Sequence, residues 1–432
     1  MTRGADAARR ATAMLDGQES QWPELSRRYR WLHEHPEPSM GERETAAALA
    51  GWLREAGYEV TEHVGGTGVV GVLRNGPGPT VLLRGDMDAL PVEETSGLPY
   101  ASRRTATLPS GDESPMMHAC GHDMHVASLL GTAQTLASGR AGWSGTVVVC
   151  GQPGEETAQG ARAMVEDGLM TRFPRPDVCL AQHVSSAGDG IVEHRAGVFM
   201  SASASIELTV HGRGGHASQP EVTIDPVLLG SYLVTRLQAV VSRETTPSDP
   251  AVLSVSMFHA GAQANVIPDD AVLTLNLRAR SEERKAKLIE AVRRIAAAEC
   301  ASYGAPRPPT LRIFSDFPAL ANDPALVDVV GGAHSALPGT TVEEGHVRMG
   351  SEDFSEFGLP GPGRYDGPPI PYVYWCYGLT DPDVWDAAPG RTREERMAAV
   401  PVAHTGDFVP RHPERTLRRG VELLLAAALC FL

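Results

Sequence analysis

The stretch Thr80-Val81-Leu82-Leu83-Arg84-Gly85-Asp86-Met87-Asp88-Ala89-Leu90-Pro91 indicates the class of fold. Its first half is a short apolar, β-branched run, which predicts a buried strand. Similar runs occur at 68–73, 146–150 and 178–181, and a helical pattern covers about 126–137. Apolar strands separated by helices predict a largely buried sheet with helices on its faces, which is an α/β domain.

Acidic residues follow two of these strands directly. Asp86 and Asp88 come after the first strand, at the edge where α/β folds bind ligands. A solvated turn explains them equally well, because Asp is a frequent turn residue. Glu155 and Glu156 repeat the arrangement after the strand that ends at Cys150. Of two adjacent acids, one can bind a metal ion while the other moves a proton, so the repetition favours a functional site.

The densest group of metal-binding residue types is His118-Ala119-Cys120-Gly121-His122-Asp123-Met124-His125. Thiol and imidazole groups suit borderline and soft metal ions. Cys120 and His122 stand just ahead of the predicted helix, where a loop can bring two side chains together. The other imidazoles of the stretch are expected to support the ligands, and Asp123 to cap the helix. The sequence leaves open a rival interpretation in which Cys120 is a nucleophile and a neighbouring His its base.

The hydrophobic pattern of the predicted strands changes near residue 200. Polar and apolar residues alternate in three segments, a last strand is expected near 310–314, and helices follow the caps Asp225-Pro226 and Ser281. The order β-α-β-β-α-β predicts a ferredoxin-like module inserted into the larger domain. We therefore expect a first part of the larger domain at 1–200, the inserted domain at 201–314 and a second part at 315–432. The Pro- and Gly-rich segment 360–401 is expected to be a long irregular loop.

Composition excludes several classes of protein. The 432 residues are 42% hydrophobic and suffice for two or three domains. A net charge of −15 argues against nucleic-acid binding, so small molecules are the expected partners. The longest apolar run, 421–432, is too short for a membrane span. Six scattered cysteines and the lack of an apolar signal segment favour a cytoplasmic protein.

One glycine-rich motif resembles a dinucleotide-binding site but lacks its other features. Residues 212–217, Gly-Arg-Gly-Gly-His-Ala, superficially fit the dinucleotide-binding fingerprint. The acidic residue that would bind a ribose about 20 positions later is absent, and the preceding strand alternates instead of being fully apolar. The sequence therefore does not predict NAD binding.

Taken together, these groups resemble the metallo-amidohydrolases of the aminoacylase and glutamate-carboxypeptidase superfamily. The branch that they resemble most is that of the hippurate hydrolases and plant auxin-conjugate hydrolases. The match extends over nearly the whole chain and rests on residues 30–37, 85–91, 117–125, 152–156, 212–220, 265–268 and 350–354, with His183 and His404.

The resemblance implies a phosphorylase/hydrolase-like metallopeptidase catalytic domain with an inserted ferredoxin-like domain that forms a homodimer. It also implies two divalent metal ions per subunit, of zinc, manganese, cobalt or nickel, because the mixed ligand set suits all four. The implied ligands are Cys120, His122, Glu156, His183 and His404. Glu155 matches the general base, His216 and Asn265 match residues that reach a substrate, and Glu352 belongs to a pocket motif whose role stays open.

The expected reaction is hydrolysis of the amide bond of an N-acyl amino acid or a related amide. Asp88 would fix the tautomer of a ligand imidazole. Arg278 is either a clamp for a substrate carboxylate or a surface residue. A dipeptidase or carboxypeptidase on the same scaffold and a non-catalytic metal-binding or small-molecule-binding protein are the alternatives. The chain lacks the expected Pro after His183, and its 365–402 stretch is longer than usual in the family, which leaves the acyl preference open.

Overall fold

The chain forms two units in the computed structural model, which describes residues 2–108 and 111–432. The first unit comprises the chain up to Gly197, together with Asn322–His346 and Asp353–Leu432. The second unit comprises Val198–Ala321 and the short segment Val347–Glu352. The second unit is therefore an insertion into the first.

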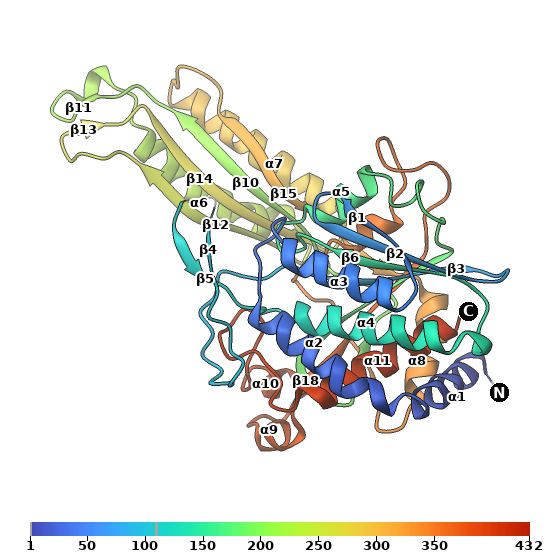
Figure 1. The fold of residues 1–432 in the computed structure, drawn as a ribbon. Helices are drawn as coiled ribbons and strands as arrows, with labels where there is room; N and C mark the ends of the chain where they lie inside the picture. The colour runs from blue at the N-terminus through green and yellow to red at the C-terminus, as the bar shows by residue number, and fades with distance from the viewer. Residues whose placement is uncertain (1, 109–110) are drawn as a thin grey trace. The chain divides into compact units, whose positions relative to one another are not determined.

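An eight-stranded sheet organises the first unit (Figure 1). Its centre is parallel, because β3 pairs with β6 and β7, and β7 pairs with β18. The strands predicted near 68–73, 80–84, 146–150 and 178–181 are all present. In sheet order the strands are β1 (Glu59–Val64), β2 (Gly68–Asn75), β6 (Gly145–Gln152), β3 (Thr80–Asp86), β7 (Val178–Gly188), β18 (Tyr372–Thr380), β8 (Ile191–His194) and β17 (Thr341–Glu344).

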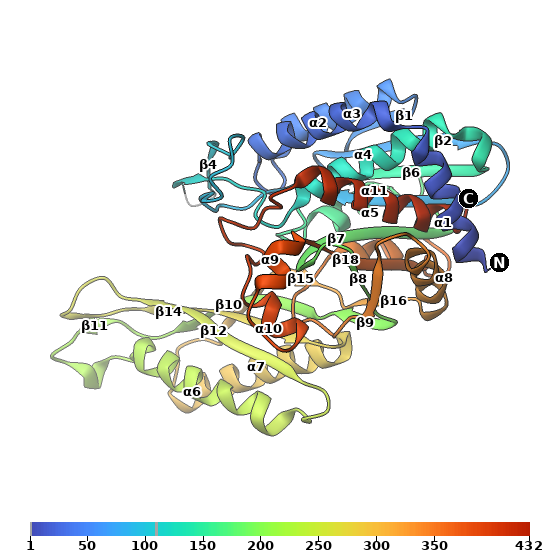
Figure 2. The ribbon, with the colours of Figure 1, turned by 90° about the horizontal axis from the view of Figure 1, so that it is seen from below.

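Helices cover this sheet and bury its apolar strands. Figure 2 shows α2, α3, α4 and α11 along one face of the sheet. Helix α4 packs on β3, and α11 packs on α4 and β7. No helix in residues 2–108 and 111–432 has the length and hydropathy needed to cross a membrane. The helices of this unit are α1 (Arg3–Asp16), α2 (Trp22–Glu34), α3 (Arg43–Glu55), α4 (His122–Ser138), α5 (Gly160–Glu166), α8 (Pro324–Ser335), α9 (Pro382–Ala387), α10 (Arg393–Met397) and α11 (Pro413–Leu429).

The expectation of an irregular loop over 360–401 is wrong. This segment contains α9, α10 and the strand β18, whose nine residues are all buried. Strand β18 lies between β7 and β8, and because all of its side chains are buried, both of its faces are covered and its sequence shows no alternation. The strand was not predicted because the residues around it are rich in Pro and Gly, which are typical of loops. Strand β7 is also longer than predicted, since pairing with β18 continues past His183 to Gly188.

The second unit has the predicted ferredoxin-like order. Its antiparallel sheet has the strand order β12-β14-β10-β15, and helices α6 and α7 pack on this sheet. Asp225 and Ser281 accept hydrogen bonds from the first turns of the two helices, as their capping roles predict. The elements are β10 (Ala202–His211), α6 (Pro226–Glu244), β12 (Ala251–Ala260), β14 (Asp270–Ala279), α7 (Glu282–Ser302) and β15 (Thr310–Phe317).

Short strands complete the structure. In the second unit, β11 (Gly215–His216) and β13 (Val266–Ile267) form a separate antiparallel pair. In the first unit, β4 (Thr105–Thr107) pairs with β5 (Glu113–Pro115). The α/β class with an inserted ferredoxin-like domain is therefore confirmed, and the parallel centre of the large sheet is where the candidate site residues gather.

Candidate metal centre

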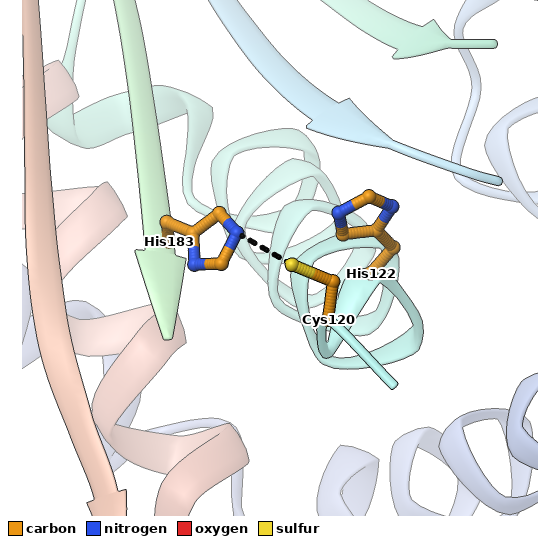
Figure 3. Close-up of side chains that lie close together, drawn as sticks. All are labelled: Cys120, His122 and His183. Atoms are coloured by element: carbon orange, nitrogen blue, oxygen red, sulfur yellow. Dashed lines mark hydrogen bonds between the residues drawn. The ribbon is translucent and has the colours of Figure 1, made fainter. Parts of the chain in front are cut away.

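Five side chains predicted to bind metal come together in the first unit. Cys120 precedes α4, His122 is its first residue, Glu156 follows β6, His183 lies on β7, and His404 lies between α10 and α11. Their ligand atoms form two groups, each within 4.8 Å: Cys120 with His122 and His183, and Cys120 with Glu156 and His404. Figure 3 shows the first group. Both groups contain Cys120, so the two groups share its thiol.

The backbone around Cys120 adopts a conformation that only glycine accommodates well. Gly121 has a φ of 79°, and a Cβ atom there would meet Val184 Cγ2 at 2.4 Å. This turn places the buried side chains of Cys120 and His122 close together at the start of α4, where the regular helical spacing would separate them. The amide of His404 donates to the Ala119 carbonyl at 2.8 Å. The last ligand is therefore docked directly onto the loop that carries the first.

Backbone carbonyls set the tautomers of two ligand imidazoles. Nδ1 of His122 lies 2.8 Å from the Asp88 carbonyl oxygen and 3.2 Å from the Asp88 carboxylate. Nδ1 of His183 lies 2.5 Å from the Val184 carbonyl oxygen. A carbonyl can only accept, so each Nδ1 carries a proton, and Nε2 is the nitrogen of each ring that is left to bind a metal ion. Nε2 of His183 points to the Cys120 sulfur at 3.4 Å (Figure 3).

The residues fit a divalent cation. Within residues 2–108 and 111–432, His122 Nε2 and Glu156 Oε1 are buried and have no hydrogen-bond partner, and His404 Nε2 lies 3.4 Å from Glu156 Oε1. Leaving such a group unpaired costs about 1–3 kcal/mol, a penalty that coordination would remove. Burial raises the pKa of the Cys120 thiol, and a bound cation would counteract this by favouring the thiolate. Imidazole, thiolate and carboxylate together suit zinc and its neighbours in the first transition row.

His125 is excluded as a ligand by its hydrogen bonds. Its Nδ1 donates to the Asp86 carboxylate at 2.6 Å, and its Nε2 accepts from the Val184 amide at 2.9 Å. No lone pair is left for a metal ion. His125 therefore supports the strand that carries His183, as the sequence suggested.

Asp123 does not cap α4, contrary to expectation. The N-cap residue is Gly121, and no side chain caps the helix. Asp123 instead contacts His33 Nδ1 at 2.7 Å, while His33 Nε2 lies 3.1 Å from Glu94. Burial lowers the pKa of His33, but the two carboxylates outweigh it and raise this pKa to about 10. The result is a buried imidazolium between two carboxylates.

His118 has a different environment. Neither of its ring nitrogens has a hydrogen-bond partner in the described part of the chain. Burial lowers its pKa to about 4, so the ring is neutral at physiological pH. His118 lines a small cavity with Tyr29, Asp123 and Phe408. It is not in either ligand group.

A buried charged network that the sequence did not predict lies at the end of β3. Arg84 is 1% exposed and donates to Asp86 at 2.6 Å and to Gln152 at 2.8 Å. Asp353 accepts from Gln152 at 2.7 Å and from the Ala161 amide at 3.1 Å. Burial raises the pKa of Asp86, but Arg84 and the nearby histidines hold it well below its usual range. The sequence feature that could have indicated this network is a charged residue, Arg84, at the end of an otherwise apolar strand.

Glu155 lies within reach of the ligands. It is 7% exposed, and one of its oxygens is within 4.8 Å of ligand atoms of His122 and Glu156. Asp88 contacts two parts of the site, because its carboxylate also accepts from the Glu156 amide at 3.0 Å. A carboxylate next to potential metal ligands is placed to exchange a proton with a molecule bound there.

Four other predicted site residues belong to the second unit. His216 and Asn265 are exposed on the β11 and β13 segments, where the Ala217 amide donates to the Asn265 carbonyl at 3.0 Å. Arg278 donates to Asn276 at 2.9 Å and to the Met349 carbonyl at 2.6 Å, so much of its guanidinium is engaged inside this unit. Glu352 ends the segment Val347–Glu352 and is 1% exposed.

Known proteins share this fold and sequence pattern. The model of peptidase family M20/M25/M40 matches residues 82–369. Thermostable carboxypeptidase 2 of Saccharolobus solfataricus is 38% identical over 342 residues, covering 78% of this chain and 83% of the relative. Hippurate hydrolase of Campylobacter jejuni is 37% identical over 331 residues, covering 76% and 82%.

A solved structure agrees with these relatives. The Bacillus subtilis YXEP protein, a dinuclear metal-binding peptidase of the M20 family, has a TM-score of 0.72 at 26% identity. The match covers 96% of this chain and 100% of that chain. The family match and both relatives confirm the resemblance seen in the sequence motifs. The chain therefore belongs to peptidase family M20/M25/M40 and stands among its amidohydrolases.

Proposed function

We propose that the protein hydrolyses the amide bond of an N-acyl amino acid or a related small amide. The observation that carries this proposal is the position of Glu155 beside two overlapping groups of metal ligands. The hippurate hydrolase and the N-acetylcysteine deacetylase of Bacillus subtilis, 34% identical to this chain, support the substrate class. The ligands proposed for two divalent ions are Cys120, His122, Glu156, His183 and His404.

The protein residues divide the work of hydrolysis. Bound divalent ions would supply polarisation of the amide carbonyl and acidification of a water molecule. Glu155 accepts the proton of the attacking water at its carboxylate and then donates it to the leaving nitrogen. Asp88 keeps the His122 proton on Nδ1, so Nε2 stays available as a ligand. We assign substrate contacts to His216, Asn265, Arg278 and Glu352.

Replacing Glu155 tests the proposed base. Glu155→Gln keeps the shape of the side chain but cannot take a proton, so kcat should fall by about 10²- to 10⁴-fold while metal content is unchanged. Glu166→Gln, on the exposed end of α5, is a control that should keep normal activity. A Glu155→Gln variant with near-normal kcat would show that the base is assigned wrongly.

Metal analysis tests the rest of the proposal. Elemental analysis of the purified protein should find more than one divalent ion per chain, of zinc, manganese, cobalt or nickel. Activity on N-acetyl and N-benzoyl amino acids should disappear in chelator and return when an ion is added. Full activity in chelator with less than one ion per chain would refute metal-dependent hydrolysis.

A carboxypeptidase activity is the second candidate. It is favoured by the similarity to thermostable carboxypeptidase 2, which is as close as the hippurate hydrolase. The two functions differ in what lies on the acyl side of the scissile bond. Comparing N-benzoylglycine with dipeptides and longer peptides would separate them, because a peptidase should cleave the peptides at least as fast as N-benzoylglycine, whereas an amidohydrolase of N-acyl amino acids should prefer N-benzoylglycine.

We also propose a homodimer formed through the second unit. Strand β12 is an edge of its sheet, and unpaired edge strands are suited to pairing with another chain. Val227, Leu228 and Tyr232 of α6 are exposed apolar residues on the same unit. Sedimentation equilibrium should give twice the chain mass of 46.0 kDa. A chain mass of one subunit across the micromolar range would contradict the dimer.

The cytoplasm is the compartment that we propose for the protein. All six cysteines, each described by the structure, are free and buried. Free thiols are usual in reducing compartments. Fractionation of the source cells should recover the protein with cytoplasmic markers, and recovery with a secreted fraction would contradict this.

A further inference from the structure

The peptide amides on both sides of Glu155 are held by buried carboxylates. The Glu156 amide donates to Asp88 at 3.0 Å. The Gly154 amide donates to Glu42 Oε1 at 2.8 Å. Asp88 was expected near the site from its place after β3, whereas nothing in the sequence connected Glu42 to Glu155. The loop that follows β6 is thus anchored immediately before and after its proposed base.

Glu42 is itself fixed in place. Its side chain is fully buried at the start of α3. Oε1 also accepts from the Met40 amide at 2.8 Å, and Oε2 accepts from the Thr67 hydroxyl. The carboxylate therefore has three donors from three different segments of the first unit. It cannot shift without losing them, so it gives the Gly154 amide a fixed point of attachment.

The conformation of Gly154 adds to this constraint. Its φ is 53°, and a Cβ atom there would lie 2.5 Å from the Met40 sulfur. Met40 thus packs closely over the same peptide that Glu42 binds. The segment around Met40 and Glu42 and the loop around Gly154 consequently fit together as one packed unit.

We propose that Glu42 is a positioning residue that holds the Gly154 peptide and thereby sets the orientation of the Glu155 carboxylate for proton transfer. This inference rests on the proposed function of Glu155. A displacement of about 1 Å at a catalytic group can cost about 100-fold in rate, so a lost anchor one residue away has a measurable effect. Burial and the negative charge of Asp88 raise the pKa of Glu42 to about 7. The folded protein therefore disfavours the ionised form of Glu42, and its negative charge does not stabilise the fold.

Two substitutions of Glu42 test whether its hydrogen bond to the Gly154 amide is what matters. Glu42→Ala removes the acceptor of the Gly154 amide. Glu42→Gln keeps an oxygen for the Met40 and Gly154 amides, and the Thr67 hydroxyl can rotate to accept from its NH₂ group. Glu37→Ala is the matched control, since Glu37 accepts from the amides at the start of α3 but from none in the Gly154 loop.

Hydrogen–deuterium exchange and kinetics test the proposal together on the metal-loaded protein. In Glu42→Ala the 152–160 peptide should exchange faster and kcat on N-benzoylglycine should fall at least about tenfold, with KM changed less than about threefold. Glu42→Gln should restore slow exchange and most of kcat, and Glu37→Ala should lower thermal stability while leaving kcat near normal. If Glu42→Ala does not fold, Glu42→Asp, whose carboxylate is one methylene shorter, takes its place.

The outcomes distinguish this inference from the proposed function. Unchanged exchange of the 152–160 peptide in Glu42→Ala overturns the inference, whatever the activity. Faster exchange with normal kcat overturns it as well, because the anchor would then not orient the base. A wild-type protein that cleaves none of the amides refutes the proposed function instead, and the exchange result still reports whether Glu42 holds the loop.

Discussion

The buried imidazolium of His33 gives a prediction whose size follows from the structure. Its two ring nitrogens contact Asp123 at 2.7 Å and Glu94 at 3.1 Å, and all three side chains are buried. His33→Gln removes the positive charge and leaves two carboxylates facing each other. Because Asp123 directly follows the proposed ligand His122, the substitution also loosens the start of α4.

The pKa of His33 gives the size of its contribution to the free energy of unfolding and the direction in which this contribution changes with pH. A pKa raised from 6.5 to about 10 means that the folded protein holds the proton more tightly than the unfolded chain. The stabilisation is therefore complete below about pH 6.5 and disappears as pH rises through about 10. At 1.36 kcal/mol per pKa unit, the contribution is about 5 kcal/mol at pH 6, about 3 kcal/mol at pH 8 and below about 1 kcal/mol at pH 10.

Urea unfolding of metal-free protein at these three pH values would measure the effect. The free-energy difference between wild type and His33→Gln should be largest at pH 6 and shrink towards pH 10. His35→Gln is the control, since His35 lies at the end of the same helix and donates to the Trp31 carbonyl. A difference below about 1 kcal/mol at pH 6, or one that grows with pH, would refute the buried imidazolium.

Further substitutions probe other parts of the first unit. Arg84→Ala should cost about 3–5 kcal/mol of unfolding free energy by urea titration, because it leaves buried carboxylates unpaired, whereas Arg162→Ala on the surface should cost below about 1 kcal/mol. Gly121→Ala should weaken divalent-ion binding measured by calorimetry, since its φ is 79° and its Cβ would clash with Val184. Glu42→Gln should unfold at a higher temperature than wild type at pH 8 and by a smaller margin near pH 5, because a carboxyl whose pKa rises from 4.5 to about 7 on folding costs stability that builds up between these two pH values. Saturating divalent ion should stabilise the wild type by about 2.7 kcal/mol at 100 times its dissociation constant, measured as a shift of the urea midpoint.

Local patterns predicted most of the fold. The apolar runs of β2, β3, β6 and β7 and the alternating strands of the second unit were recognisable because their periodicity reflects how many faces are buried. Strand β18 was not, because a strand buried on both faces shows no period and its neighbours are rich in Pro and Gly. The irregular loop expected there was inferred from composition alone.

The candidate ligands were also named from sequence, but through their resemblance to a family. A lone His183 or His404 carries no local signal of its role. The roles of Arg84 and Glu42 could not be predicted, since each depends on partners that are remote in sequence. Arg84, for example, lies in one buried network with Asp353, which is 269 positions away.

The sequence by itself determined most of the strands and helices, the inserted module and the chemical types gathered after the strands, because these follow from periodicity and short spacings. Tertiary structure alone decided which imidazole nitrogens carry a proton, which partners occupy both nitrogens of His125, and that two ligand groups share Cys120. The physical reason is that hydrogen bonding and burial depend on distances in space. Asp88 and Glu42, which hold the peptide on either side of Glu155, are 67 and 113 positions away from it in the chain.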